Sequence, residues 1–407
     1  MGARAHLPHV RVSDVSALAA LALSAAEAAT IPTAWRQADL AADIYRRAAA
    51  LKDAQENVVL SPWGVANLFA LLQTGACGDT ARGMAFALQL GGVETPAPDE
   101  VAATFREART ALSRAANEDV ALELSDSLWL APGFEPAAEF LARARSDFDA
   151  EARATKMGAA GRKAINDFVA DKTHGRIKDL IGPPILDDPL TSLVAVDTVY
   201  LKAKWFQSFD KHATRDETFH APAGDVKVPF LHARRQAQIL DAPECAALRL
   251  PYRRSSLEML LILPSPTNTL AEIEGRIGGP WLDRLAASPW QGEAVLAIPK
   301  FDFGSQHDLR PILEPMGMAA AFSPADADFS NIAQGLSIAT AMQKANITVD
   351  EDGTEAAAGT FVAMMAAGAP MGNRPPPRPF VADRPFLFLI RETRTGLILF
   401  MGRVVKP

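Results

Sequence analysis

The chain has 407 residues, of which 49% are hydrophobic and 22% are charged, and its net charge is -7. This length could hold several domains, but a single domain built on large mixed sheets also reaches this size. The chain is acidic and has no Lys/Arg-rich run, so we do not expect nucleic acid as a partner. The two cysteines, Cys77 and Cys245, are far apart in sequence and predict buried thiols rather than a disulfide framework.

The first 30 residues allow two interpretations. Arginines precede a short apolar run at 15–26, and Ala26-Glu27-Ala28 offers the small residues of a cleavage site, which is typical of a secretory signal peptide. Asp14 and Glu27 favour instead a disordered or helical Ala-rich extension. The apolar run is too short to span a bilayer. A signal peptide predicts a secreted protein, extracellular or periplasmic, whereas the alternative predicts a cytoplasmic one.

Helical and strand-like patterns alternate through the N-terminal half. Helical spacing at 34–52 precedes an apolar strand that ends with Ser61-Pro62, and Pro62 suits the first turn of the next helix. That helix, at 65–74, is apolar on most sides and is therefore expected to be buried. Further along, the patterns predict a helix capped near Asp79 and Thr80, helices at 98–116, 136–148 and 159–173, and strands at 120–130 and 192–201.

The C-terminal half is mainly strand-like. The patterns predict strands at 226–231, 246–250, 258–263 and 294–303, with helical patches at 270–277 and 309–316. A Pro-rich stretch at 370–379 predicts an extended, exposed segment. A closing antiparallel pair is expected at 385–390 and 397–404. This order of elements, without internal repeats, predicts a mixed α/β fold.

One segment near the C-terminus combines a strand-like start with a run of small residues. It is acidic at 350–352 and then reads Gly353-Thr-Glu-Ala-Ala-Ala-Gly-Thr360. Small side chains bury little apolar area, so they suit a strand that slides between two strands already in place. Alternate residues from Thr354 form an uncharged set, and the other set has Glu355 as its only charge, so a sheet could bury one face and leave Glu355 in water. An Ala-rich helix or a flexible linker is the alternative, although the glycines and threonines disfavour a long helix.

The order of these segments over 34–407 resembles the serpin family. The motifs that carry the resemblance, besides the small-residue segment, are Asn57-Val-Val-Leu-Ser-Pro62, Asn166-Asp-Phe-Val169, Thr173-His-Gly-Arg-Ile177, Val199-Tyr-Leu-Lys-Ala-Lys-Trp205, Val226-Lys-Val-Pro229, Ile298-Pro-Lys300, Met316-Gly-Met318, Phe329-Ser-Asn-Ile332, Arg384-Pro-Phe386 and Phe400-Met-Gly-Arg-Val404. The resemblance implies a single α+β (mixed α/β) domain over 31–407, with three β-sheets, eight or nine helices and an exposed reactive loop at about 350–384. Frequent alanine and arginine hint at a GC-rich bacterial source.

The resemblance also implies an activity, suicide inhibition of serine proteases and sometimes of cysteine proteases, without catalytic residues or a cofactor. The protease attacks the loop as a substrate and forms an acyl-enzyme. Cleavage then frees the hinge side of the loop to enter the large sheet and carry the distorted protease to the opposite end. The native fold must therefore be metastable and held by kinetics. We expect a monomer whose partner is the target protease.

The resemblance assigns site residues at three places. The hinge comprises Glu351, Gly353, Thr354, Glu355, Ala356, Ala357, Ala358, Gly359 and Thr360. At the breach, where the sheet opens, Trp205 lies beneath the opening and Lys300 pairs with Glu351, as a surface pair worth at most about 1 kcal/mol. At the shutter, lower in the sheet, the matching residues are Ser61, Asp197 and Gln343.

The shutter departs from the usual family pattern. Gly64 stands in place of a second serine, Asp197 in place of an asparagine and Gln343 in place of a common histidine. The network that restrains sheet opening must therefore be built differently, and we expect a hydrogen bond between Asp197 and Gln343. Replacing Asp197 by alanine should speed spontaneous conversion to a latent or polymeric form.

Hinge spacing places the reactive bond. Counting from Glu351 as the serpin family does, the seventeenth residue is Ala367, so the resemblance implies cleavage between Ala367 and Gly368. A small residue at this position suits elastase-like or subtilisin-like proteases, whose primary pockets accept small side chains. Ala366, Met365 and Met371 remain alternatives, because the loop after Ala367 is long and rich in proline.

Two other classes of function compete with inhibition. A non-inhibitory serpin, acting as a carrier, storage protein or chaperone, predicts a charged or bulky hinge, which this chain lacks. An enzyme is disfavoured because no Gly-x-Ser-x-Gly motif occurs and the histidines lack metal-ligand spacing. These scattered histidines are His174, His212, His220, His232 and His307. The helix expected at 98–116 has few basic residues, so activation by a polyanion is not expected.

Overall fold

The computed structural model describes residues 37–91, 94–183, 185–188, 191–287, 289–354 and 376–407. The two sheets and most of the helices share one hydrophobic core, and a second, smaller cluster lies between α7 (Ala159–Lys172) and the outer face of the six-stranded sheet. The predictions for the first 30 residues, for hinge residues 355–360 and for the bond between Ala367 and Gly368 lie outside the described residues.

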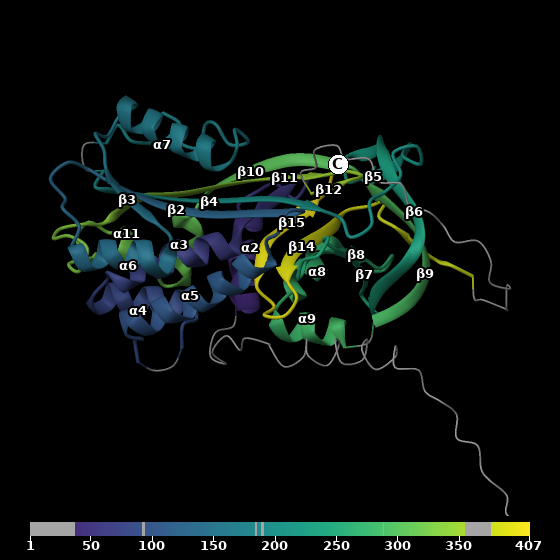
Figure 1. Ribbon diagram of the computed structural model, residues 1–407, viewed down its shortest axis with the longest axis horizontal. Coiled ribbons are helices and arrows are strands. Elements are labelled where there is room, and N and C mark those ends of the chain that lie inside the picture. The colour runs from purple at the N-terminus through teal and green to yellow at the C-terminus, as the bar shows by residue number, and fades with distance from the viewer. Residues whose placement is uncertain (1–36, 92–93, 184, 189–190, 288, 355–375) are drawn as a thin grey trace, which may run out of the picture.

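The site lies in a six-stranded sheet (Figure 1). Its order is β10 (Phe301–Asp308), β11 (Ile338–Val349), β12 (Gly353–Thr354), β4 (Leu193–Lys204), β2 (Val120–Leu130) and β3 (Glu151–Ala154). The central strand β4 is almost entirely buried, as its continuous β-branched and apolar sequence predicts. It pairs with β2 over eleven consecutive positions, from Val120 opposite Ala203 to Leu130 opposite Leu193.

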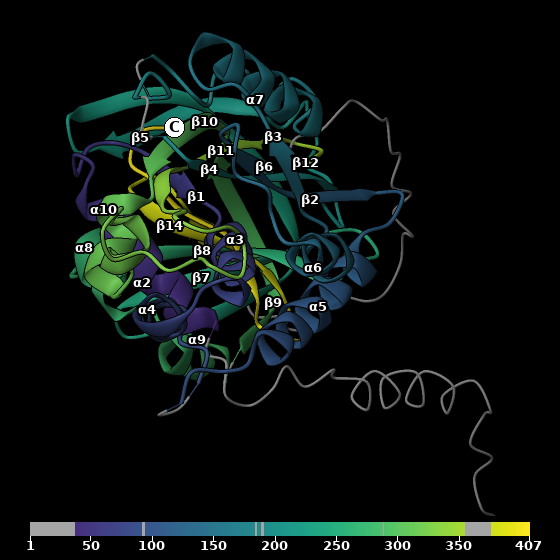
Figure 2. The same cartoon turned by 90° about the vertical axis from the view of Figure 1, so that its left-hand side faces the viewer.

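The second sheet curves around the core beside the first (Figure 2). It runs β1 (Val58–Leu60), β15 (Ile398–Val404), β14 (Phe386–Glu392), β8 (Leu257–Pro264), β7 (Cys245–Pro251), β6 (Gly224–Ala242), β9 (Pro289–Pro299) and β13 (Arg378–Val381), with β5 (Arg215–Ala221) on β6. The long strand β6 pairs with β5 near its start and with β7 near its end. Strands of two of the three expected sheets are therefore joined by hydrogen bonds into this one nine-stranded sheet.

Helices cover the six-stranded sheet unequally. Only α7 (Ala159–Lys172) lies on its outer face among the described helices, and α2 (Gln37–Ala50), α3 (Pro62–Thr74), α4 (Gly78–Ala87), α5 (Pro98–Ala115) and α6 (Ala138–Phe148) lie beneath it (Figure 1). Every residue of α3 is buried, as expected from a sequence that is apolar on most sides. Shorter helices are α8 (Leu270–Arg276), α9 (Gly279–Ala286), α10 (Arg310–Leu313), η1 (Glu314–Met316) and α11 (Ala319–Phe322).

Several predicted elements need correction. The strand expected at 294–303 is two strands, β9 and β10, which break at Lys300. The helix α4 was expected to be capped by Asp79 and Thr80, but its N-cap residue is Cys77. It begins at Gly78, so Asp79 and Thr80 lie inside its first turn. Both cysteines are free thiols, but only Cys245 is fully buried. No helix in the described ranges is long and apolar enough to cross a bilayer.

Candidate functional site

The six-stranded sheet is closed at one end and parted at the other. Strands β11 and β4 pair in parallel from Ile338 opposite Leu193 up to Gln343 opposite Asp197. Above that point β12 enters between them, where Thr354 is opposite Ala203 on β4 and Val349 on β11. A narrow cleft beneath Thr354, lined by β4 and β11 residues and by residues 173, 176 and 177, continues the line of β12. The hinge therefore begins as an antiparallel strand between two parallel ones.

A tight turn brings the chain from β11 into the gap. The Asp350 side chain accepts hydrogen bonds from the backbone N–H groups of Asp352 (2.8 Å) and Gly353 (3.1 Å), and the Asp350 N–H donates to the Gly353 carbonyl (3.0 Å). A Cβ atom added to Gly353 would lie 2.0 Å from the carbonyl oxygen of Ala203. Glycine is therefore required sterically where the hinge meets β4.

Two buried aromatic side chains hold this turn from below. The Trp205 ring stacks on Tyr252 with centroids 4.9 Å apart, and its Nε1 donates to the Asp350 carbonyl oxygen at 2.9 Å. The Tyr252 and Thr354 hydroxyls hydrogen-bond at 2.6 Å. Trp205 thus lies at the breach, where the resemblance places it. Tyr252 was not recognised in the sequence, because nothing local marks a tyrosine in the β7–β8 turn as a hinge contact.

The expected contact between Lys300 and Glu351 is present, with 2.8 Å between Lys300 Nζ and Glu351 Oε2. The Glu351 side chain is only 8% exposed, so this is not the surface pair assumed from the sequence. Burial raises the pKa of Glu351, but hydrogen bonds from Lys300, from its own backbone and from Thr214 outweigh burial and lower the pKa overall. The first hinge carboxylate is therefore fixed in its charged form.

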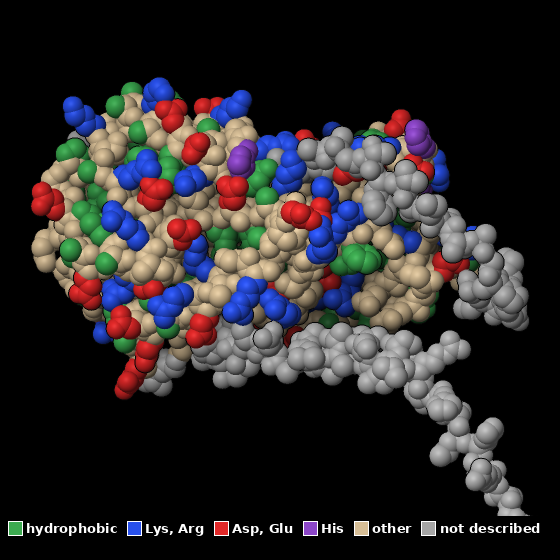
Figure 3. Space-filling model, in the orientation of Figure 1, with side chains coloured by type: hydrophobic (Ala, Val, Ile, Leu, Met, Phe, Trp, Pro, Cys, Tyr) green, Lys and Arg blue, Asp and Glu red, His purple; other side chains and the backbone are tan. Residues whose placement is uncertain are grey.

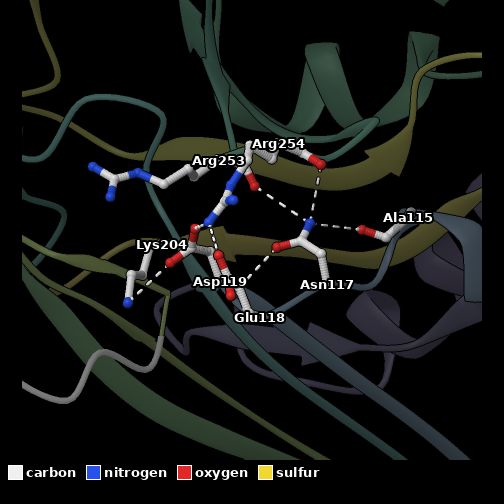
Figure 4. A network of polar contacts seen from close by, with 7 residues as sticks. All are labelled: Ala115, Asn117, Glu118, Asp119, Lys204, Arg253 and Arg254. Atoms are coloured by element: carbon white, nitrogen blue, oxygen red, sulfur yellow. Dashed lines mark hydrogen bonds and ion pairs between the residues drawn. The ribbon is translucent and has the colours of Figure 1, made fainter.

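A second polar network ties the end of β4 to neighbouring loops (Figure 4). Asp119, just before β2, binds Lys204 Nζ at 3.0 Å and Arg254 Nη2 at 2.6 Å. Hydrogen bonds from Arg254 and then Lys204 lower the pKa of Asp119. Asn117 Nδ2 donates to the Arg254 carbonyl oxygen at 3.0 Å. Because Lys204 is opposite Gly353, this network fixes the strand edge against which the hinge rests.

At the shutter, Gln343 connects three elements. Its Nε2 donates to Asp197 Oδ2 at 2.5 Å and to the Ser61 carbonyl oxygen at 2.8 Å, and its Oε1 accepts the Ser61 N–H at 2.9 Å. The Ser61 hydroxyl caps α3 by accepting the N–H of Gly64. The hydrogen bond expected between Asp197 and Gln343 therefore joins β4 to β11 at the top of their paired segment.

The unusual glycine at position 64 and the unusual aspartate at position 197 depend on each other. A Cβ atom at residue 64 would lie 2.2 Å from Asp197 Oδ2, so the absence of a side chain in Gly64 makes the space that the Asp197 carboxyl occupies. Replacing Gly64 by alanine should cost roughly 1–3 kcal/mol of native-state stability by overpacking. The double variant Gly64→Ala/Asp197→Ala should lose less than the sum of the single variants, as measured by denaturant unfolding. Additive losses would show that the two sites are independent.

The sequence did not reveal that a second buried carboxyl group lies beside Asp197. Asp126 on β2 lies directly opposite Asp197 in the strand register, and both side chains are buried. Asn67 on α3 donates to Asp126 Oδ2 at 2.5 Å. Burial raises the pKa of Asp126 to about 6, and burial followed by the nearby Asp126 charge raises the pKa of Asp197 well above its usual range. Both carboxyl groups therefore favour their neutral forms more than an exposed aspartate does. The one available signal was an acidic residue at an inward position of the strand predicted at 120–130.

Comparisons with known proteins agree with this geometry. The family described as "Serpin (serine protease inhibitor)" matches residues 36–407. A serpin-like protein of Thermococcus kodakarensis is 35% identical over 371 residues, covering 90% of this chain and 83% of its own. Glia-derived nexin of Rattus norvegicus is 32% identical over 370 residues, covering 86% of this chain and 88% of its own.

Solved structures show the same fold. Native protease nexin-1 with heparin superposes with a TM-score of 0.81 at 27% identity, covering 91% of this chain and 98% of that one. Thyroxine-binding globulin in complex with thyroxine gives 0.80 at 27% identity, with the same coverage. Proteins of this family are generally inhibitors of serine proteases rather than enzymes. The extent of the family match and the identity to these relatives show that the chain belongs to the serpin family.

Proposed function

We propose that this protein is a suicide inhibitor of serine endopeptidases, with Ala367–Gly368 as its reactive bond and elastase-like or subtilisin-like proteases as its targets. The observation that carries the proposal is the position of Thr354, which occupies the first rung of an antiparallel strand between β4 and β11. Thr354 is uncharged and only 2% exposed. The entry point of the large sheet is therefore already formed.

The register of β12 defines how a cleaved loop would continue. Extending it one residue at a time along β4 places Ala356 opposite Leu201, Ala358 opposite Val199 and Met364 opposite Leu193. The uncharged alternate set would then face the core with Ala203 and Leu201, and Glu355 would fall on the outer face opposite Lys202. Residues 353–364 would fill β4 from end to end. Ala367 would come just past the far end of the sheet, which is where an acylated protease must be carried.

The energetics favour this insertion. About a dozen residues would gain backbone hydrogen bonds on both sides, each worth roughly 0.5–1.5 kcal/mol net, which is of order 10 kcal/mol after losses to loop ordering. The uncleaved form is then a kinetically trapped state.

A polyanion is not part of the proposal, although protease nexin-1 has been solved with heparin. Two arginines of α5, Arg106 and Arg109, already pair with Asp147 and Asp149, and basic and acidic side chains are interspersed on the face shown in Figure 3.

The test is incubation with elastase, subtilisin, chymotrypsin and trypsin, followed by denaturing gels and mass spectrometry of released peptides. We expect an SDS-stable complex with elastase or subtilisin and release of a peptide that begins at Gly368. Release beginning at another residue would move the reactive bond while keeping the inhibitor. Clean cleavage without a complex and without a gain in thermal stability would contradict inhibition and favour a non-inhibitory carrier.

A further inference from the structure

A cavity of 460 Å³ lies behind the breach, between the segment that follows β4 and strands β6, β7 and β9. Its apolar lining includes Trp205, Phe206, Leu250, Pro251 and Leu296. Phe206 is unusual because its side chain is large and the residue is 58% exposed. An exposed aromatic ring at the edge of a partly apolar cavity is the kind of surface that a small hydrophobic ligand covers.

The charge balance of this cavity is positive. Arg235 is partly buried against it, with its guanidinium 4.4 Å from the centroid of the Phe209 ring and its Nη1 donating to the Gln207 carbonyl oxygen. Burial lowers the pKa of Arg235 to about 10, and no carboxylate of the described residues offsets that loss. Buried cations in proteins are normally paired with an anion. The Arg235 guanidinium, which is partly exposed to solvent, is therefore held by a carbonyl oxygen and an aromatic ring without a carboxylate partner among the described residues.

The other charged side chains of the cavity are already paired. Glu258 accepts hydrogen bonds from Arg249 at 2.7 Å and from Arg391 at 2.9 Å, so it is not available to Arg235. The neighbouring residue Arg234 projects from β6 as an exposed side chain and pairs with Glu293 at 3.0 Å. Consequently Arg235 is the cation that a ligand in this cavity would meet.

We propose that this cavity binds a small amphipathic anion, a carboxylate or sulfonate carried on a hydrophobic ring or chain, with Arg235 holding the acid group and Phe206 and Trp205 covering the apolar part. The ligand class follows from the unpaired guanidinium beside an exposed aromatic wall. Such an anion would supply the missing counter-charge and remove the Phe206 ring from water.

The same cavity is connected to the hinge through one side chain. Trp205 lines the cavity, and its Nε1 holds the Asp350 carbonyl oxygen at the start of the hinge turn. An occupied cavity fixes Trp205 and with it the seated turn, so ligand should slow loop insertion. This consequence rests on the proposed inhibitory function, whereas the binding itself does not.

Binding is tested by titration calorimetry and tryptophan fluorescence with 2-naphthoate, decanoate and indole-3-acetate, and with naphthalene-2-methanol as the neutral analogue. We expect saturable one-to-one binding of at least one carboxylate and at least tenfold weaker binding of the alcohol. Arg235→Gln should weaken carboxylate binding at least tenfold, and the matched control Arg234→Gln should leave it unchanged. Phe206→Ala, at an exposed position that does not threaten folding, should also weaken binding.

The possible outcomes separate the two proposals. Absence of saturable binding for all three carboxylates at millimolar concentration, or equal affinity of the wild type and Arg235→Gln, would overturn the inference. Equal affinity for acid and alcohol would overturn it as well. A protein that binds the carboxylate but forms no SDS-stable complex with any protease keeps the cavity assignment and loses the inhibitory function.

Discussion

Replacing Thr354 by arginine should convert the protein from an inhibitor into a substrate of its target protease. Thr354 is buried between β4 and β11 and hydrogen-bonded to Tyr252, so an arginine there would have to bury a charge without a partner. The first rung of the inserted strand would be lost, and the acyl-enzyme would hydrolyse before the loop could enter. We expect the number of inhibitor molecules consumed per protease inactivated to rise at least tenfold, with the SDS-stable complex replaced by cleaved protein.

The matched control is Glu355→Arg, one residue further along. The register of β12 assigns this position to the outer face, where a charge remains in water during insertion. This variant should inhibit nearly as well as the wild type. Equal loss of inhibition in both variants would contradict the face assignment, and retained inhibition by Thr354→Arg would contradict strand insertion at this point.

Raising the pH from 5 to 8 should weaken the native state through the carboxyl pair of the shutter. The pKa of Asp126 is about 6 in the folded protein, above its unfolded value of about 3.9. A carboxyl group with a raised pKa contributes stability below its unfolded pKa and loses that contribution as the pH rises through the folded pKa. A shift of about two units corresponds to about 3 kcal/mol in total, of which about half is already lost by pH 5 and the rest, on the order of 1 kcal/mol, is lost between pH 5 and 8. The raised pKa of Asp197 extends the loss to higher pH.

Other groups near or within this pH range must be separated from the pair. Among the neighbouring charges, Arg109 lowers and Asp149 raises the pKa of Asp126. His232 and His307 have pKa values lowered by burial, so they add stability as the pH rises and partly mask the effect. The wild type and Asp126→Asn are therefore compared at each pH. Two quantities are measured for both proteins, the melting temperature and the rate of conversion to latent or polymeric forms, and the difference between the proteins isolates the pair.

Asp126→Asn keeps a hydrogen-bonding group opposite Asp197 but cannot ionise. We expect its melting temperature to fall less between pH 5 and 8, by a few degrees relative to the wild type. Asp119→Asn serves as the control, because the pKa of Asp119 is lowered and this carboxyl is already ionised across the range. Identical pH slopes for the wild type and Asp126→Asn would show that the pair does not control stability.

The sequence predicted the elements and the hinge better than it predicted the contacts between distant segments. Strand β2 matches its predicted bounds, and Thr354 was assigned to a buried face from alternation alone. The departures at Gly64, Asp197 and Gln343 were visible as single residues. Their interlocking was not, because a glycine makes room for a carboxyl group only when α3 and β4 are packed together.

The residues missed share a physical cause. Each of them contacts a residue that is distant in sequence, and local patterns do not encode such contacts. The partner is 71 residues away for Asp126, 102 residues away for Tyr252 and 137 residues away for Thr214. Strand β11 was recognised only at its end, although burial alternates along its second half. Strands β3 and β5 were not predicted, because both are short and mostly unburied and so carry little apolar pattern. The unpaired state of Arg235 likewise depends on which carboxylates the fold brings near it.

The location of the hydrogen bond between Asp197 and Gln343 has a kinetic consequence. In the register of β12, the residue that arrives opposite both Asp197 and Gln343 is Thr360, six residues beyond Thr354. The upper half of the cleft can therefore fill before the parallel pairing of β4 and β11 has to break. If the cleaved loop inserts as proposed, deacylation and translocation would compete at this midpoint. The shutter would then set the fraction of encounters that end in a trapped protease, and also the lifetime of the uncleaved protein.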